Sequence, residues 1–173
     1  MTARAVAPLS ALLLAACGGG GGGSAICAYI SGGGSSVTST VDPACSGCSV
    51  SNERAAADGD LGTGATVTIS PVIGASDGVS IRATAQHGVV FPAGAEPVIH
   101  FSKANGRLCR GMSTYLDGAV QDSSPAFCFQ EANASGYDSM VASLPFDAVQ
   151  IDLTSTEALE NAVIDIDEIC ADQ

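Results

Sequence analysis

The stretch Val79-Ser80-Ile81-Arg82-Ala83-Thr84 alternates apolar and polar side chains, and so does Thr66-Val67-Thr68-Ile69-Ser70. Alternation with a period of two is the pattern of a β-strand that buries one face. Outward from these segments, further strands are predicted at residues 98–102, 146–153 and 163–169. Many short strands separated by turns predict an all-β fold, a β-sandwich of the jelly-roll type with at most short helical turns.

The segments between these strands carry turn and helix signals. Pro92-Ala93-Gly94 predicts a turn, and Asn105-Gly106 predicts a tight hairpin whose return strand covers residues 107–116. An apolar run at residues 25–31 predicts a first strand. A helical turn is predicted over residues 155–162, since Ser155 is a fair N-cap.

Length and composition fit one exported domain, predicted to cover residues 25–173. A chain of 173 residues with 21 glycines suits a loop-rich β protein, and the aromatic content of 5%, without tryptophan, predicts a light core. The formal charge of −12 repels phosphate backbones, so nucleic-acid binding is excluded as a function.

The N-terminus, residues 1–16, has the features of a signal peptide. One basic residue precedes an apolar run that is about half as long as the roughly 20 residues that span a bilayer. The run ends in Leu14-Ala15-Ala16-Cys17, which resembles the lipobox of bacterial lipoproteins. The alternative is an ordinary signal peptide followed by a chance cysteine.

The lipobox resemblance implies that Cys17 receives diacylglycerol and becomes the acylated N-terminus. Membrane partnership through this lipid, and localisation in the bacterial cell envelope, follow from it. The residue after this cysteine is Gly18 and not aspartate, which under the sorting rules of enterobacterial lipoproteins favours the outer membrane. The glycines after Cys17 cannot pack, so residues 17–24 are predicted to be a lipidated cysteine and a flexible tether.

The remaining cysteines are even in number, which in an exported chain predicts disulfides with 15 possible pairings. Cys109–Cys128 is favoured because it flanks a segment that could be a strand pair. The other four would form two more bridges. The Cys45–Cys48 spacing also allows redox chemistry, but a turn surrounds it, and zinc would need a second matched pair. The six cysteines are Cys27, Cys45, Cys48, Cys109, Cys128 and Cys170.

Short motifs occur in a fixed order: residues 45–52 (CSGCSVSN) with residues 55–63 (AAADGDLGT), then residues 91–94 (FPAG), residues 146–149 (FDAV) and residues 166–170 (IDEIC). In this order they resemble modules of bacterial cell-surface proteins and discoidin-like, galactose-binding-like jelly rolls. The resemblance covers most of the chain between the first and last motif and implies a jelly-roll fold.

The resemblance also implies a calcium site, because the equivalent loop binds structural calcium in several such domains. The predicted ligands are Asp58 and Asp60, joined by Thr63 and by Glu168 from the last strand. The EF-hand pattern is absent. The alternative is an acidic turn in which the aspartates accept hydrogen bonds from backbone amides.

Catalytic motifs are lacking. Ser76 is not in a G-x-S-x-G arrangement, and His87 and His100 do not form an HExxH motif. The chain is therefore predicted not to be an enzyme, although paired carboxylates for glycoside hydrolysis could arise in three dimensions.

The favoured function is a surface-anchored lipoprotein with a non-catalytic binding, adhesion or structural module for an unknown protein or glycan. The alternative is a carbohydrate-binding module, in which Tyr29, Tyr115 and Tyr137 are the tyrosines that could stack on sugars. A hydrolytic enzyme ranks third.

Overall fold

The fold consists of strands and one short helix. A computed structural model describes residues 30, 35–70, 78–155 and 161–172. The predicted all-β class is confirmed, with a single 3-10 helix among the described residues. The elements are β1 (Ser36–Val41), β2 (Ser49–Ser51), η1 (Glu53–Ala57), β3 (Ala65–Ile69), β4 (Gly78–Thr84), β5 (Glu96–Leu116), β6 (Ala119–Ser123), β7 (Phe127–Ser139), β8 (Ala148–Thr154) and β9 (Ala162–Asp172).

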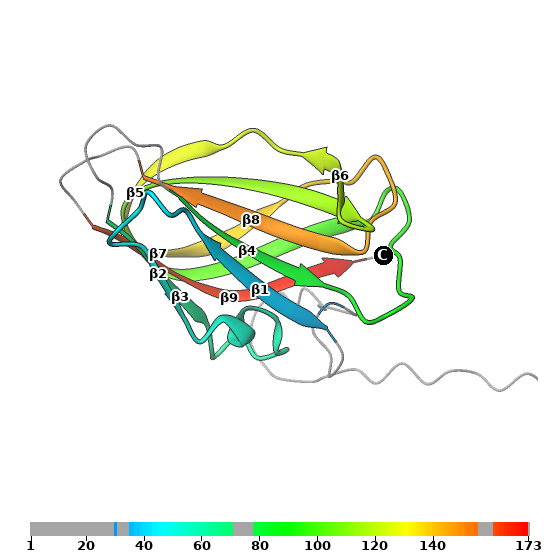
Figure 1. The fold of residues 1–173 in the computed structure, drawn as a ribbon, viewed down its shortest axis with the longest axis horizontal. Helices are drawn as coiled ribbons and strands as arrows, with labels where there is room; N and C mark the ends of the chain where they lie inside the picture. Colours follow the sequence, from blue (N-terminus) through cyan, green and yellow to red (C-terminus); the bar gives the residue numbers. More distant parts are fainter. Residues whose placement is uncertain (1–29, 31–34, 71–77, 156–160, 173) are drawn as a thin grey trace, which may run out of the picture.

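The strands form a sandwich in which β5 belongs to both layers (Figure 1). The hydrogen-bonded order is β1-β4-β8-β5-β9-β3-β2, with β6 and β7 also paired to β5. The first half of β5 pairs with β9 and its second half pairs with β8, so the strand bends from one layer into the other. Strands close in sequence, such as β3 and β4 or β8 and β9, lie in opposite layers, as in a jelly roll.

The predicted hairpin at Asn105-Gly106 is wrong, because β5 runs through it without turning back. Lys103 and Gly106 have positive φ angles of 50° and 90°, and the register with both neighbouring strands shifts here. These are bulges that bend a strand. Pairing with β7 on one edge and β9 on the other has overridden the local turn signal.

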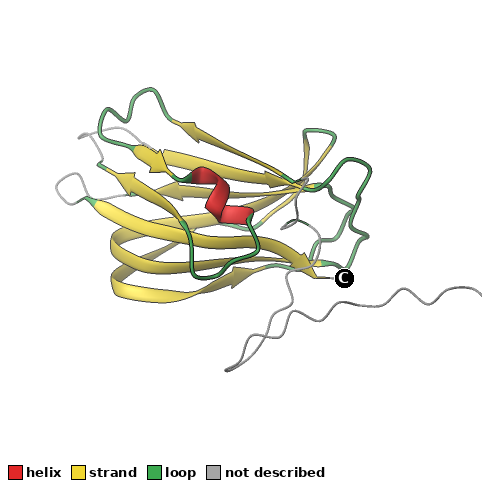
Figure 2. Cartoon of the chain, turned by 90° about the horizontal axis from the view of Figure 1, so that it is seen from below, coloured by secondary structure: helices red, strands yellow, loops and turns green. Residues whose placement is uncertain are grey.

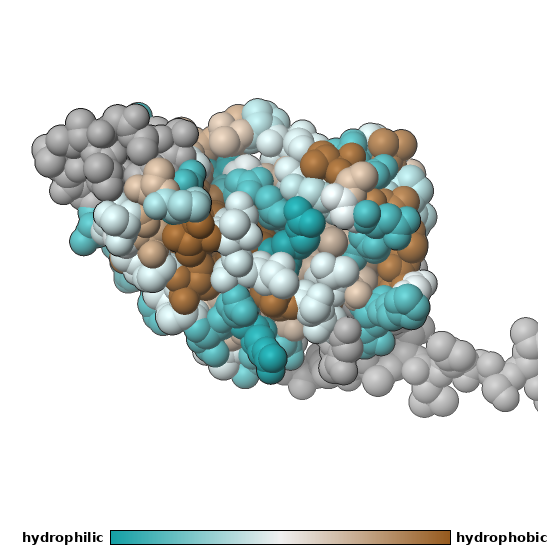
Figure 3. Space-filling model, in the orientation of Figure 1, coloured by the Kyte–Doolittle hydropathy of each residue, from teal (hydrophilic) through white to brown (hydrophobic). Residues whose placement is uncertain are grey.

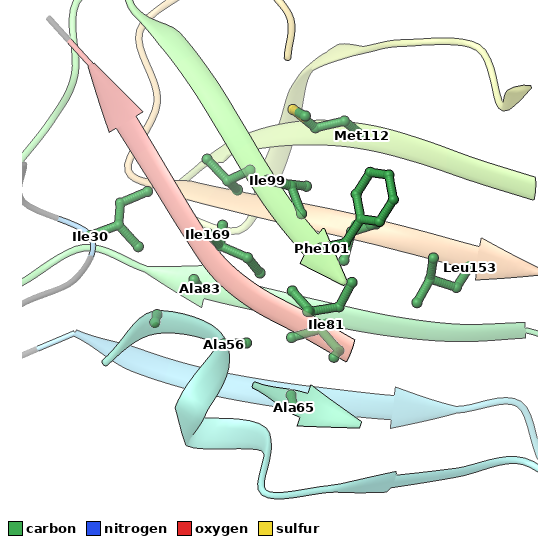
Figure 4. Packing of buried hydrophobic residues seen from close by; sticks show 14 of the residues in the cluster. Ile30, Ala56, Ala65, Ile81, Ala83, Ile99, Phe101, Met112, Leu153 and Ile169 are labelled. Carbon is green, nitrogen blue, oxygen red and sulfur yellow. The ribbon is translucent and has the colours of Figure 1, made fainter. Parts of the chain in front are cut away.

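The alternation of apolar and polar residues along the strands explains which side chains form the core. β4 follows the burial pattern that its sequence predicts, with Val79, Ile81 and Ala83 inside. Figure 4 shows side chains of β5, among them Ile99, Phe101 and Met112, in the same interior as residues of β4, β8 and β9. The predicted strands at 66–70, 79–84, 98–102, 146–153 and 163–169 all lie within observed strands, apart from one or two terminal residues.

Two smaller elements close the sandwich. Helix η1 packs against β1 and β9 at the surface (Figure 2) and buries Ala55, Ala56 and Ala57. At one end the rings of Phe91 and Phe146 stack with centroids 5.0 Å apart, and their backbones form an isolated bridge. The predicted turn at 92–94 follows directly.

Some predictions fall outside the described residues: the signal peptide, Cys17 and its tether, nearly all of the first strand at 25–31, and most of the helical turn at 155–162. Within the described part of the chain, no helix has the length and apolar character needed to cross a membrane. On the face seen in Figure 3, apolar side chains form small separate groups among polar ones.

Candidate binding cleft

A cleft of about 380 Å³ opens beside the paired strands β5 and β7. Its floor consists of core side chains, and aromatic and polar side chains surround them. The floor residues are Ile99, Met112 and Ile151, and the surrounding residues are Arg110, Gly111, Ser124, Phe127, Phe129, Tyr137, Asp138 and Ser139.

The register between β5 and β7 places two aromatic rings on the inward side of the sheet. Phe127 lies opposite Arg110, and Phe129 lies opposite Leu108, which is fully buried. Opposed residues of an antiparallel pair point to the same face. Strand β7 pairs only with β5 among the described strands. Phe127 and Phe129 therefore lie on the core-facing side of the sheet, but outside the part of the sandwich that the other strands enclose.

Arg110 is the polar centre of the cleft. Its side chain is only 5% exposed, and it forms ion pairs of 2.8 Å with both Glu131 and Asp138. The guanidinium carbon also lies 4.2 Å from the ring centre of Phe101 and 4.8 Å from that of Phe129. Charge-assisted hydrogen bonds and ring stacking together fix this side chain in one position.

Exposed aromatic side chains gather on β7. Phe127 is 58% exposed, Phe129 44% and Tyr137 66%, and all three line the cleft. They are three of the eight aromatic residues in the chain. Exposed apolar groups concentrated at a concave site mark a binding surface.

The three tyrosines considered for sugar stacking have different positions. Tyr137 lines the cleft. Tyr115 is 9% exposed, and the guanidinium carbon of Arg82 lies 3.6 Å from its ring centre, so Tyr115 offers no open face for a ligand on that side. Tyr29 lies outside the described residues.

The acidic loop brings its predicted residues together, but as a hydrogen-bonded turn. Asp58 accepts hydrogen bonds from the amide of Asp60 and the hydroxyl of Thr63, and Asp60 accepts one from the amide two residues ahead. Glu168 accepts a hydrogen bond from the amide of Gly59. Among the described residues no group of three or more acidic, histidine or cysteine side chains could hold a metal.

A second acidic group lies on β9. Burial works against ionisation of Asp165, but hydrogen bonds from Lys103 and Thr66 outweigh it and hold the pKa of this carboxyl below its ordinary value. Burial raises the pKa of Asp167, against a hydrogen bond from Ser102. Lys103 is an exposed partner, so this is a surface feature.

The structure contains the favoured disulfide Cys109–Cys128, which joins β5 to β7 at directly opposed residues. It also contains Cys45–Cys48, and Cys170 is disulfide-bonded as well. The Cys45–Cys48 bridge lies in the turn before β2, not at the start of a helix that follows a strand. Cys27 lies outside the described residues.

The two histidines lie on different segments of the chain. His87 is exposed in a turn, and the ring of His100 lies 6.0 Å from that of Tyr137 in a tilted geometry. Ser76 lies outside the described residues.

Sequence reasoning singled out only Tyr137 of this cleft. It did not identify Phe127, Phe129, Arg110 or the two carboxylates that bind the guanidinium. The pattern Phe127-Cys128-Phe129 was a usable signal, because residues two apart share a face of a strand. Their link to Arg110 depends on strand register, which the sequence did not reveal.

No family model matches the chain, and no curated protein matches it. Several solved structures are similar. One is the family 32 carbohydrate-binding module of NanJ from C. perfringens in complex with galactose, at 12% identity and a TM-score of 0.45, covering 79% of this chain and 92% of that one.

Two further similar structures are also family 32 modules. The module of AlyQ in complex with 4,5-unsaturated mannuronic acid has 11% identity and a TM-score of 0.47, covering 79% of this chain and 94% of the other. CpGH89CBM32-5 from Clostridium perfringens in complex with GalNAc-β-1,3-galactose has 14% identity and a TM-score of 0.47, covering 80% and 95%. At these values none of them assigns a role to a residue of this chain.

Proposed function

We propose that this chain is a non-catalytic carbohydrate-binding module held at the bacterial cell envelope by a lipid on Cys17. One observation carries the binding part: the exposed rings of Phe127 and Phe129 lie on the same face of β7 and line one cleft together with hydrogen-bonding groups. This places carbohydrate binding above the general adhesion or structural role that the sequence favoured.

The chemistry of the cleft matches that of a sugar ring, which has an apolar C–H face and a rim of hydroxyls. The rings of Phe127 and Phe129 can cover the apolar face. The carboxylate of Asp138, which is 32% exposed, supplies a polar partner for the rim. Apolar rings combined with a few placed polar groups are usual at small-ligand sites, and this cleft has both.

The proposal includes no catalysis. Asp138, which lines the cleft, and the neighbouring Glu131 both bind the guanidinium of Arg110. Retaining and inverting glycosidases need one carboxyl group free to protonate the leaving oxygen and a second to act on the opposite side. Here both are engaged with the same cation, so we expect bound glycans to be recovered intact.

A glycan array probed with the full-length chain tests the binding proposal. Binding to a defined set of glycans, lost in Phe127→Ala/Phe129→Ala and retained in Val120→Ala, supports it. Val120 is a matched control because it is an apolar side chain that is 56% exposed on β6 and does not line the cleft. Absence of binding to every glycan, or equal binding by both variants, would overturn it.

The anchoring part rests on the lipobox resemblance at residues 14–17. Mass spectrometry of the protein from its native host should find diacylglycerol on Cys17, and Cys17→Ser should release or mislocalise the protein without unfolding it. An unacylated Cys17 would contradict anchoring and leave glycan binding untouched.

Calcium binding by Asp58, Asp60, Thr63 and Glu168 stays a prediction. If the ion binds, millimolar calcium will raise the melting temperature, and Asp58→Ala/Asp60→Ala will abolish the rise. No shift in the wild-type chain would leave these residues as turn-forming groups, the role for which hydrogen bonds are present.

Protein adhesion remains a second candidate because of one feature of β7. This 13-residue strand pairs only with β5 among the described strands, so its other edge can add a strand from a partner. Prolines placed on the outer edge of β7 would block the addition of a strand. Adhesion would be favoured if these prolines abolished binding of a protein partner and the wild-type chain recognised no glycan.

A further inference from the structure

We infer that the cleft selects neutral glycans and rejects those that carry a carboxylate. The inference rests on the proposed function and adds the charge class of the ligand. It depends on the ion pairs that Arg110 forms with carboxylates of the protein, and on the negative charge that these carboxylates bring to the site.

Arg110 is the cation of the cleft lining, and two of its nitrogens donate to carboxylates of the protein. Its Nε donates to Asp138 and its Nη1 donates to Glu131, each at 2.8 Å. The rings of Phe101 and Phe129 stack on its guanidinium plane. To form a bidentate hydrogen bond with Arg110, the carboxylate of a uronate would have to displace one of these two carboxylates.

The net charge of this group is negative. One guanidinium against two carboxylates leaves −1 on this group, of which Arg110 and Asp138 line the cleft, in a chain whose formal charge is −12. Asp138, at 32% exposure, is the more accessible of the two carboxylates, whereas Glu131 is 13% exposed. An incoming sugar therefore meets an anionic acceptor, which suits hydroxyl donors and repels a second anion.

Matched pairs of oligosaccharides test the inference, each pair sharing one sugar configuration and differing in charge: galactose against galacturonate, glucose against glucuronate, and mannose against mannuronate. Their dissociation constants for the full-length chain are measured by calorimetry at low and at physiological salt. In every pair that binds, we expect the neutral member to bind at least about tenfold tighter, with a smaller ratio at higher salt because screening weakens repulsion.

Variants tie the preference to the named carboxylates. Asp138→Asn should reduce the neutral-to-acidic ratio to near one, and Glu131→Gln/Asp138→Asn should reverse it, because Arg110 is then uncompensated. Glu96→Gln removes the same charge at an exposed position of β5 outside the cleft and should leave the ratio unchanged. Where the double variant fails to fold, Asp138→Asn alone carries the test.

The outcomes separate the two proposals. Equal or tighter binding of the acidic member, or a ratio that Asp138→Asn leaves unchanged, would overturn charge selection while glycan binding stands. If no neutral or acidic sugar binds, the proposed function itself is wrong.

Discussion

Two pairs of phenylalanines occupy opposite environments in this molecule. Phe91 and Phe146 are fully buried, stacked on each other and bridged through their backbones at one end of the sandwich. Phe127 and Phe129 stand on the edge-exposed strand β7, 58% and 44% exposed. A chain with few aromatic residues thus uses one pair to close its core and leaves the other in contact with water.

This difference separates stability from binding. Exposed aromatic surface contributes little to folding, since it stays hydrated in the folded state, whereas a buried ring contributes through transfer and packing. Changes to the two pairs should therefore affect different measurements, the stability of the fold for Phe91 and Phe146 and ligand binding for Phe127 and Phe129.

Phe146→Ala should lower the free energy of unfolding by about 3–5 kcal/mol, because it removes a buried ring and leaves a cavity. Urea denaturation of this variant and of Phe127→Ala makes the comparison. A loss below about 1 kcal/mol in Phe146→Ala would contradict the role of the stacked pair in the core.

Removing the Cys109–Cys128 bridge with Cys109→Ala/Cys128→Ala should cost about 3 kcal/mol of stability, by the loop-closure relation for residues 19 apart. Cys45→Ala/Cys48→Ala closes a shorter loop and should cost about 2 kcal/mol by the same relation. Only the first pair joins β7 to β5, so only its loss should also weaken glycan binding. Equal effects of both on binding would contradict a role for β7.

Phe127→Ala should raise the dissociation constant of the best array glycan about tenfold, corresponding to roughly 1.4 kcal/mol of lost ring contact. Its stability should change by less than about 0.5 kcal/mol, as for other exposed side chains. Calorimetric titration and denaturation of the same preparation measure both. A stability loss like that of Phe146→Ala would show that the two pairs do not differ as described.

The smallest effects concern Asp165 and Asp167 of β9, which belong to neither phenylalanine pair. The depressed pKa of Asp165 gives stability that is present above its unfolded pKa of about 3.9 and is lost as the pH falls through the folded value. Asp167 has a raised pKa, so its contribution is present below about 3.9 and is lost as the pH rises through the folded value.

At pH 7, Asp165→Asn should therefore lower stability slightly and flatten its fall in acid, and Asp167→Asn should raise it slightly. Thermal unfolding from pH 2 to pH 7 measures both. Glycan binding should be unaffected, and the same sign of change in both variants would contradict the assignment.

Alternation in the sequence predicted β3, β4, β8 and β9, because each buries one face and its side chains record that pattern. It did not predict β7, which is exposed along most of its length and carries no such pattern. The continuous path of β5 was also missed, because the Asn105-Gly106 signal is local, whereas pairing with β7 and β9 is set by the tertiary fold.

The same limit applies to the cleft. Tyr137 could be named from composition alone, as one of three tyrosines. Arg110 contacts Glu131 and Asp138, which lie 21 and 28 residues away, and only the register of β7 on β5 brings them together. The acidic loop, in contrast, was visible as a motif, since Asp58, Asp60 and Thr63 interact over a few residues.

The most direct test is to locate the bound glycan by NMR chemical-shift changes in the full-length chain as the best array glycan is added. The expected shifts concentrate in residues 108–112 of β5 and 127–139 of β7, with the strongest at Phe127, Phe129 and Asp138. Shifts concentrated instead at the acidic loop, residues 58–63, or no shifts at saturating glycan, would contradict the assignment of this cleft as the binding site.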